Sequence, residues 1–337
     1  MVLLKPEIGS EKSKSIRASS SNLTLVGDVG GTNCRLAFAE RNPSGAVTLH
    51  HTERYAVADF DHFNDVVGHF LETYDLHVNQ AAFAFAGPKF DDEIRMTNLN
   101  WIVSEVELSR KFGFDKVVVI NDFVAMASGA MVTPEAGFDV LIHGDPDPLK
   151  PIIVLGPGTG LGVSCVLPGD PHHFVPTEGG HTAFSPRTEL ECEILAYWSS
   201  RLSFVSAETL LSGPGLVRLH EAICAIQDRQ CDLSLAADIV TRAGLDTNSA
   251  AYLAVTEFCS MLGGFAGDAA VMQGASGRAI IGGGVARHIS KFIPQSSFVS
   301  RFKDRGPGSW YLQNTPVHLL KANFVPLYGA AAMVLDQ

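Results

Sequence analysis

The sequence predicts an α/β fold of two domains in which mixed sheets are flanked by helices. At 337 residues the chain is long for one hydrophobic core, so two domains are expected. A strand, a glycine-rich turn and a second strand occur twice, over residues 23–38 and 152–167. Short strands that alternate with helical stretches follow the first copy, which is typical of a mixed sheet covered by helices.

The first copy opens a domain with the element order β-β-β-α-β-α-β. Apolar residues at helical spacing between Phe60 and Tyr74 predict a helix with one buried face. Ser104, with Glu107 three residues later, forms a capping box that begins a second helix, and Gly113 ends it. Strands are expected at 23–29, 34–40, 47–57, 81–86 and 116–120.

The second copy begins a domain that is mostly helical between Thr188 and Ala275. An apolar strand at 278–281 then runs into three consecutive glycines. A late strand is expected at 317–321 and a last helix at 328–335.

Charge, hydropathy and cysteine spacing argue against several classes of protein. The formal net charge is −11, whereas duplex-binding proteins usually carry a basic face, so no nucleic-acid partner is expected.

Glycine and proline interrupt the uncharged stretch 152–169, so no membrane-spanning segment is expected. The six cysteines show neither zinc-binding nor redox C-x-x-C spacing and are typical of reduced thiols in a cytoplasmic protein. Residues 1–21 mix charges and lack an apolar segment, which predicts a disordered extension rather than a secretory signal.

The first glycine-rich turn, Gly30-Gly31-Thr32-Asn33, follows a strand with Asp28 near its end. Glycine removes side-chain bulk and exposes backbone amides to an anion such as phosphate. Asp28 is placed where it could hold a hydrated Mg²⁺ ion. A plain hairpin in which Asp28 caps the turn explains the same residues, but the presence of the second glycine-rich turn favours phosphate binding.

The second turn reads Gly156-Pro-Gly158-Thr159-Gly160-Leu-Gly162. No Gly-Lys-Ser/Thr follows, and leucine stands where G-x-G-x-x-G requires its last glycine. These departures disfavour both a P-loop ATPase and an ordinary dinucleotide enzyme. Two such turns, about 130 residues apart, suggest two domains that hold one phosphate chain between them.

Polar residues at three other places are candidates for chemistry. Asn121 and Asp122 directly follow an apolar strand, which is a common catalytic position, although an Asx helix cap fits equally well. Glu178 and His181 flank a Gly-Gly bend, and a surface turn would have the same composition. Glu208 lies in a helical stretch, where a solvated glutamate is ordinary.

Six short segments of the sequence together resemble those of a known family. They are Leu25-Val-Gly-Asp-Val-Gly-Gly-Thr-Asn33, Met96-Thr-Asn-Leu-Asn-Trp101, Ile120-Asn-Asp-Phe123, Gly158-Thr-Gly-Leu-Gly162, Glu178-Gly-Gly-His181, and Val205-Ser-Ala-Glu208 continued by Ser212-Gly-Pro-Gly-Leu216. In this order, and over roughly residues 23 to 335, they resemble the bacterial glucokinases of the hexokinase/actin-like superfamily. Any one segment is weak, but together they are specific.

The resemblance implies a two-lobed actin-like ATPase (ribonuclease H-like) fold with a cleft between the lobes. It implies a small domain of residues 22–132 and 322–337 and a large domain of residues 133–321. It also implies a cytoplasmic, homodimeric glucokinase that uses ATP and Mg²⁺ to phosphorylate the 6-hydroxyl of glucose.

The resemblance also assigns roles to residues. Asp122 matches the family's catalytic base, and Asp28 would hold Mg²⁺ through water. The sugar ligands that it implies are Asn121, Asp122, Glu178, His181 and Glu208, with Asn98 and Asn100 in a loop at the rim of the sugar site. The nucleotide-binding residues that it implies are Asp28, Gly30, Gly31, Thr32, Asn33, Gly158, Thr159, Gly160, Gly282, Gly283 and Gly284, the last three on the adenosine side.

The sequence lacks two features of related families, and three other functions are compatible with it. The cysteine-rich zinc motif of the related repressor/kinase family is missing, so no structural metal is implied, and no helix-turn-helix domain fits into the short N-terminal extension. The chain could be a kinase for another hexose or an N-acylhexosamine, a non-catalytic sugar-binding regulator, or an actin-like filament or chaperone ATPase. The intact Asn121-Asp122 pair argues against a regulator, and the sugar-site residues argue against an ATPase that acts without sugar.

Overall fold

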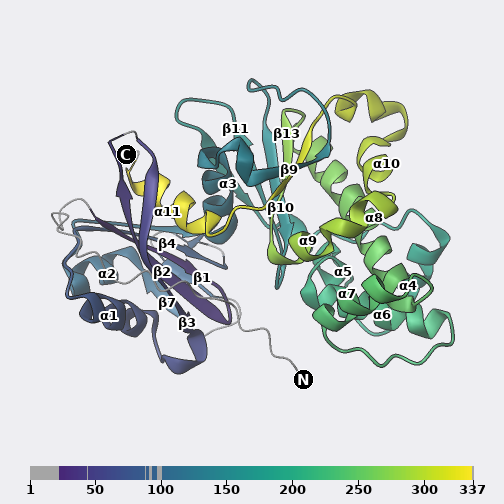
Figure 1. The fold of residues 1–337 in the computed structure, drawn as a ribbon, viewed down its shortest axis with the longest axis horizontal. Helices are drawn as coiled ribbons and strands as arrows, with labels where there is room; N and C mark the ends of the chain where they lie inside the picture. The colour runs from purple at the N-terminus through teal and green to yellow at the C-terminus, as the bar shows by residue number, and fades with distance from the viewer. Residues whose placement is uncertain (1–22, 44, 88, 91–92, 97–100, 336–337) are drawn as a thin grey trace.

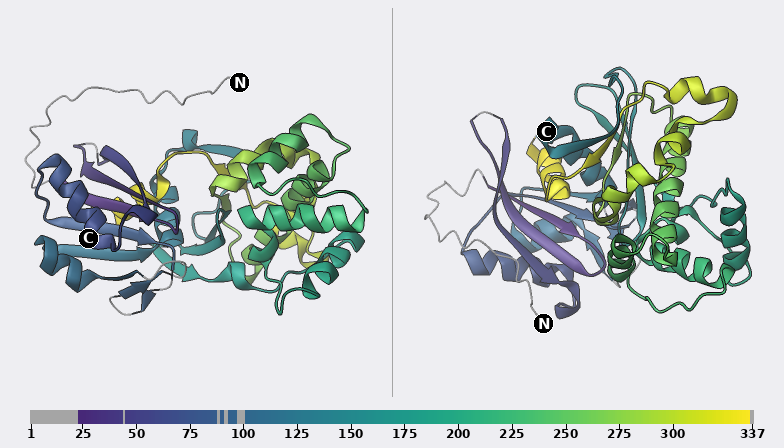
Figure 2. Two further views of the ribbon diagram at one scale, coloured as in Figure 1. Left: turned by 90° about the horizontal axis from the view of Figure 1, so that it is seen from below. Right: turned by 45° about the vertical axis from the view of Figure 1, so that its right-hand side comes forward.

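The structure is a computed structural model that describes residues 23–335 except 44, 88, 91–92 and 97–100. Its strands form two large mixed sheets, one in each half of the molecule, with helices packed around both (Figure 1). The two views in Figure 2 show the same separation into halves. The expectation of mixed sheets flanked by helices is therefore confirmed.

The first sheet has the strand order β3-β2-β1-β4-β8, in which β1, β4 and β8 are parallel and β2 and β3 are antiparallel. All five strands were expected, and their ends differ from the expected ones by no more than one residue. The elements of this half are β1 Thr24–Val29, β2 Asn33–Arg41, β3 Val47–Ala56, α1 Phe63–Tyr74, β4 Gln80–Phe85, α2 Glu105–Phe112 and β8 Lys116–Asn121.

Local capping signals set the ends of the two helices in this half. The side chain of Ser104 accepts a hydrogen bond from the N–H of Glu107 at 3.4 Å, and Gly113 ends α2 with a left-handed φ of 74°. Helix α1 begins three residues later than predicted, because His62 and Asp65 form the capping box at its start. The two helices cover one face of the sheet. Strand side chains alternate between the two faces, and Leu25 of β1 packs in one apolar cluster with residues of α1 and α2.

The second sheet has the order β12-β11-β10-β13-β14-β9. Strands β9 and β12 were not anticipated, and both are short edge strands of five residues. The side chains of β12 are mostly exposed, whereas Phe138 and Ile142 at the ends of β9 are buried. A small three-stranded sheet next to the first sheet was also missed. The strands are β9 Phe138–Ile142, β10 Ile152–Pro157, β11 Leu161–Leu167, β12 His173–Thr177, β13 Arg278–Ile281 and β14 Val317–Leu320, and in the small sheet β5 Lys89–Phe90, β6 Glu93–Arg95 and β7 Ile102–Ser104.

Helices of the C-terminal half surround α8, which is buried on nearly every side and forms the centre of the largest core. A buried ion pair joins the outer helices, with the Arg301 guanidinium donating to Glu191 at 2.6 and 3.1 Å. No helix within the described residues has the length and apolarity needed to cross a membrane. The helices are α4 Glu189–Ser199, α5 Ala207–Leu210, α6 Gly213–Ile226, α7 Ala236–Leu245, α8 Ala250–Met272, α9 Gly284–Ile289 and α10 Phe298–Lys303.

Two helices from distant parts of the chain, α3 (Asp122–Val132) and α11 (Val325–Leu335), cross each other in close contact between the sheets (Figure 1). Helix α11 packs on the face of the first sheet that carries Val26, and α3 packs on the second sheet. The crossing is close because glycines meet there: a Cβ on Gly129 would overlap the Val325 carbonyl, and one on Gly329 would overlap the Ala125 carbonyl.

We expect Gly129→Ala to destabilise the protein by roughly 1–3 kcal/mol, because the added methyl group forces α3 and α11 apart. Gly68→Ala in α1 is the matched control, since its Cβ would meet its nearest neighbour, Phe112, at 3.8 Å. That control should be neutral or stabilising by up to about 1 kcal/mol from helix propensity. Chemical denaturation of both variants checks this, and equal stabilities would contradict the close crossing.

Candidate active site

Asp28 and Asp122 lie at the C-terminal ends of parallel strands of the first sheet. Asp28 in β1 lies opposite Ala84 of β4, and Ala84 lies opposite Ile120 of β8. Because neighbouring strands are spaced about 4.8 Å apart, the backbone at Asp28 is about 10 Å from the end of β8, where Asp122 follows. Carboxyl ends of parallel strands border the ligand site in many α/β proteins.

Asn121 caps α3, so the helix-cap alternative is correct for this residue. Its Oδ1 accepts hydrogen bonds from the N–H groups of Phe123 at 2.9 Å and Val124 at 3.2 Å. Its Nδ2 donates to the carbonyl of Gly87 at 3.3 Å. The cap holds Asp122 at the first helical position, next to the edge of the sheet.

Asp122 lies where its protonated form is favoured. Burial, followed by the negative charge of Asp28 and a smaller contribution from Glu178, raises the pKa of Asp122 to about 7. The N–H of Phe123, which donates to Asp122 Oδ1 at 2.9 Å, acts in the opposite direction but does not overcome burial. The carboxyl group is therefore poised to take up or release a proton near neutral pH, and the charges of Asp28 and Glu178 both act on it.

Arg35 is a site residue that the sequence analysis missed. Its Nη1 donates to Asp28 Oδ2 at 3.0 Å, and this ion pair opposes the burial that raises the pKa of Asp28. The signal was available in the hairpin, because Arg35 stands directly opposite Asp28 in the β1–β2 register. Opposite charges at such positions commonly pair.

The first glycine-rich turn is a tight hairpin connection. The N–H of Gly30 donates to the Asn33 carbonyl at 2.9 Å, and Asn33 Oδ1 accepts from Arg54 Nε at 2.8 Å. The φ of Gly30 lies outside the left-handed region, so this glycine serves by removing bulk rather than by adopting a left-handed angle. The turn follows Asp28 at the C-terminal end of β1.

The second glycine-rich turn is shaped by close contacts. A Cβ on Gly162 would overlap the Phe123 ring, and one on Gly160 would displace the Glu208 carboxylate from its present position. By contrast, a Cβ on Gly158 would meet no atom within 4 Å, which places Gly158 beside open space. Thr159 is exposed at the tip of the turn.

The three consecutive glycines Gly282, Gly283 and Gly284 lie against this second turn. Gly283 has φ 85°, where other residues are strained, and a Cβ on it would overlap the Pro157 carbonyl. The N–H of Gly282 donates to the Leu155 carbonyl at 2.7 Å. Gly284 borders open space, because a Cβ there would meet nothing within 4 Å. Two turns that are more than 100 residues apart in the chain thus form one glycine-lined surface.

Glu208 connects the second turn to the neighbouring helices. Its Oε2 accepts a hydrogen bond from the Leu161 N–H at 2.7 Å. Ser212, four residues later, caps α6 and donates to the Glu208 carbonyl at 2.9 Å, while the Gly213 N–H donates to the Gly158 carbonyl at 2.8 Å. Glu208 is thus not a freely solvated helical glutamate.

Glu178 and His181 lie on the short turn η4 (Gly179–His181) and its cap. Both side chains are 62% exposed, with His181 Nε2 3.9 Å from Glu178 Oε2. The charge of Glu178 contributes to the raised pKa of Asp122, so this turn acts electrostatically on the start of α3. Asn98 and Asn100 lie outside the described residues.

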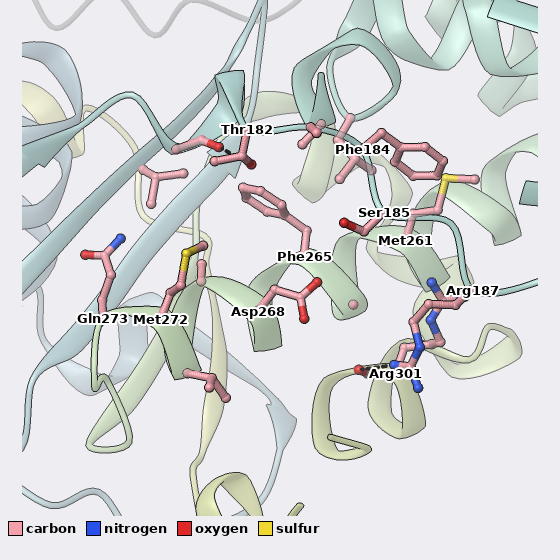
Figure 3. Close-up of a pocket in the computed structure, with 18 of the residues that line it drawn as sticks. Thr182, Phe184, Ser185, Arg187, Met261, Phe265, Asp268, Met272, Gln273 and Arg301 are labelled. Atoms are coloured by element: carbon pink, nitrogen blue, oxygen red, sulfur yellow. Dashed lines mark hydrogen bonds between the residues drawn. The ribbon is translucent and has the colours of Figure 1, made fainter. Parts of the chain in front are cut away.

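A separate cavity of about 390 Å³ lies behind the η4 turn, between this turn, α5, α8 and α10 (Figure 3). Figure 3 shows Arg187 and Arg301 at one end of it and Phe265 and Asp268 projecting from α8. The residues that line it include none of the described site residues that the sequence predicts. The convergence of carboxylates and glycine turns, rather than this cavity, therefore marks the candidate active site.

Comparison with known proteins gives a consistent picture. The family model described as Glucokinase matches residues 25–337. A glucokinase of Saccharophagus degradans is 37% identical over 318 residues, which cover 93% of this chain and 98% of that protein. The crystal structure of a glucokinase from an Antarctic psychrotroph aligns with a TM-score of 0.83 at 32% identity, covering 94% of this chain and 99% of that one.

A more distant structure shares the fold. A ROK family glucokinase from Streptomyces griseus, crystallised in complex with glucose and AMPPNP, aligns with a TM-score of 0.67 at 20% identity, covering 94% of this chain and 100% of that one. Together with the sheet topology, these matches confirm the expected two-lobed actin-like fold.

The raised pKa of Asp122 predicts how stability depends on pH. Between the unfolded value near 3.8 and the folded value of about 7, the folded protein binds more protons than the unfolded chain, so stability falls as pH rises. Asp122→Asn cannot ionise at this position and escapes that loss. We expect the variant to match the native protein near pH ~4 and to exceed its unfolding free energy by on the order of 2–4 kcal/mol at pH ~8.

Denaturant titrations across this pH range measure the difference between the two proteins. Asp115→Asn, at an exposed position just before β8, is the control for the substitution itself. A difference that stays constant with pH would show that Asp122 ionises normally.

Proposed function

The chain belongs to the glucokinase family, and on that premise we propose how its residues phosphorylate glucose with ATP. Transfer of the γ-phosphoryl group of ATP to the 6-hydroxyl of glucose, giving glucose 6-phosphate and ADP, is the activity of this enzyme. The observation that carries our assignment of residues is the environment of Asp122, a half-buried carboxyl group just after the end of β8 whose pKa is raised to about 7.

Asp122 acts as the general base. Its carboxylate accepts the proton of the sugar's 6-hydroxyl while that oxygen attacks the γ-phosphorus and the bond to ADP breaks. A base works best when its pKa lies near the working pH, and the position of Asp122 meets that condition. Because phosphoryl transfer depends mainly on positioning and charge stabilisation, the rigid cap at Asn121 supports this role as well.

The sugar is held by Asn121, Asp122, Glu178, His181 and Glu208, with Asn98 and Asn100 at the rim. Carboxylates accept charge-assisted hydrogen bonds from sugar hydroxyls, and Glu178 presents an exposed carboxylate whose charge acts on Asp122. Asn121 Oδ1 already accepts two backbone hydrogen bonds, so this residue would reach the sugar through Nδ2.

The nucleotide lies between the two glycine-rich turns, with its phosphates on Gly30, Gly31, Thr32 and Asn33 and on Gly158, Thr159 and Gly160. Its adenosine lies along Gly282, Gly283 and Gly284. The open space beside Gly158 and Gly284 supports this placement, because a ligand could lie directly on the backbone there.

Mg²⁺ is a proposed part of the reaction, and Asp28 fits it as a ligand. Carboxylate oxygen is the donor that Mg²⁺ prefers, but Arg35 occupies Asp28 Oδ2, which favours contact through a water molecule. When bound with ATP, Mg²⁺ supplies neutralisation of the charge on the phosphates.

Three further features follow from the family resemblance. We propose that residues 22–132 with 322–337 and residues 133–321 form the two domains, which the packing of α11 on the first sheet supports. We also propose a cytoplasmic homodimer whose product enters glycolysis. The free cysteines of the described chain are compatible with a reducing compartment.

Asp122→Asn should lower kcat by about 10²–10⁴-fold and leave glucose affinity within roughly tenfold, because it removes the base and preserves the shape of the site. The measurement is ADP release from MgATP with glucose, and with mannose, fructose and N-acetylglucosamine in parallel. Asp115→Asn, at an exposed position just before β8, should turn over normally. Near-native turnover by Asp122→Asn would reject the general-base role, whereas ADP release without any sugar would reject the kinase itself.

Two glutamates should be separable by their kinetics. Glu178→Gln should raise the KM for glucose by roughly 10–100-fold, from the loss of charged hydrogen bonds, with little effect on the KM for ATP. Glu208→Gln should raise both, because Glu208 also holds the Leu161 N–H of the phosphate turn. Glu193→Gln, at an exposed position of α4, is the control. Identical kinetic profiles for the Glu178 and Glu208 variants would contradict the distinction.

A further inference from the structure

A second group of chemically reactive side chains lies on α6, away from the candidate active site. His220 and Cys224 are four residues apart, so they project from the same face of the helix. Cys231 belongs to the segment between α6 and α7, which turns back toward the helix at Asp228, where φ is 52°. The Arg229 N–H fixes this return by donating to the Cys224 carbonyl at 2.8 Å.

The donor atoms of these three residues converge. Cys224 Sγ is 3.5 Å from His220 Nε2, Cys231 Sγ is 3.6 Å from His220 Nδ1, and one ligand atom from each residue lies within 4.8 Å of the others. Within the part of the chain that the structure describes, this is the one set of three His, Cys, Asp or Glu residues that meets that distance.

We propose that His220, Cys224 and Cys231 form a binding site for one zinc ion or a similar thiophilic cation. Two thiolates and an imidazole are a common zinc donor set. With Zn–S bonds of about 2.3 Å and Zn–N bonds of about 2.0–2.1 Å, the edges of a tetrahedral site are roughly 3.5–3.8 Å. The distance of 3.5 Å between Cys224 Sγ and His220 Nε2 already lies in that range.

Only a small rearrangement is required to complete the site. The two sulfur atoms contact different ring nitrogens of His220, so an ion on Nε2 needs Cys231 Sγ to swing toward that nitrogen. Cys231 is exposed on a connecting segment, whereas His220 and Cys224 are 3% and 1% exposed, so Cys231 is the residue that can move.

Charge and space also suit a divalent cation. Two thiolates balance the charge of Zn²⁺, so the half-buried site would hold no net charge. A neighbouring polar cavity of about 300 Å³ is lined by His220, Cys224 and Asp232 among others, and it leaves room for a water molecule as the fourth ligand. An ion here would fasten the segment after α6 to the helix.

The site would be structurally separate from phosphoryl transfer. Cys224 lies eleven residues beyond Gly213, the first residue of α6, which contacts the phosphate turn, and that span is about 16 Å at 1.5 Å per residue. Substitution of Cys231 should therefore leave turnover of glucose unchanged, which provides a check that the variant is folded.

The test is zinc titration of chelator-treated, fully reduced protein in competition with a chromogenic chelator. We expect one zinc ion per chain, a higher melting temperature with zinc, and an affinity that Cys231→Ser lowers by more than about 100-fold. Cys192→Ser removes an exposed thiol of α4 outside the cluster and should bind as the native protein does. Replacement by Co²⁺ should give the thiolate charge-transfer and tetrahedral absorption bands in the native and Cys192→Ser proteins alone.

Two results would overturn the proposal. The first is the same zinc affinity in Cys231→Ser and in Cys192→Ser, which would mean that the bound metal lies elsewhere. The second is an absence of zinc binding by the reduced native protein, which would leave a thiol–imidazole hydrogen-bond cluster. Mass mapping without reductant would then reveal whether Cys224 and Cys231 join in a disulfide instead.

Discussion

The close crossing of α3 and α11 is the contact on which the arrangement of the molecule depends. Helix α11 comes from the far end of the chain, packs on the first sheet and meets α3, which packs on the second. Gly129 and Gly329 permit this approach, and Ser128 Oγ adds a hydrogen bond to the Gly329 carbonyl at 3.2 Å. Because Asp122 is the first residue of α3, the same crossing that joins the two halves also positions the proposed base.

The raised pKa of Asp122 at the start of α3 lowers the stability of the folded protein above neutral pH, but it suits the proposed role of this residue as a base. A carboxylate at the first position of a helix is normally stabilised by the helix dipole and by backbone N–H groups. For Asp122 the N–H of Phe123 is present, yet burial and the charge of Asp28 raise the pKa to about 7. Arg35 balances part of the charge by pairing with Asp28. A proton acceptor that works near neutral pH requires this incomplete compensation.

Glycine in the second glycine-rich turn serves mainly to let other groups come close. Gly160 makes room for the Glu208 carboxylate and Gly162 for the Phe123 ring, so each links the second turn to a residue on another element. Gly158 has no such neighbour and faces open space. Gly283, by contrast, adopts a left-handed φ of 85°. Close approach therefore explains more of the glycine pattern than backbone freedom does.

The sequence by itself determined the features that depend on neighbouring residues. These include both glycine-turn hairpins, the five strands of the first sheet, the Ser104 cap and the strand before the three glycines, because turn chemistry and side-chain periodicity act over a few positions. Family resemblance in its motifs also indicated the reaction. Only the tertiary structure decided which distant groups meet. It alone brought Arg54 to Asn33, Glu208 to the second glycine-rich turn and Cys231 to His220, and it paired the edge strands β9 and β12. Such contacts are set by packing between elements far apart in the chain, and no local pattern encodes them.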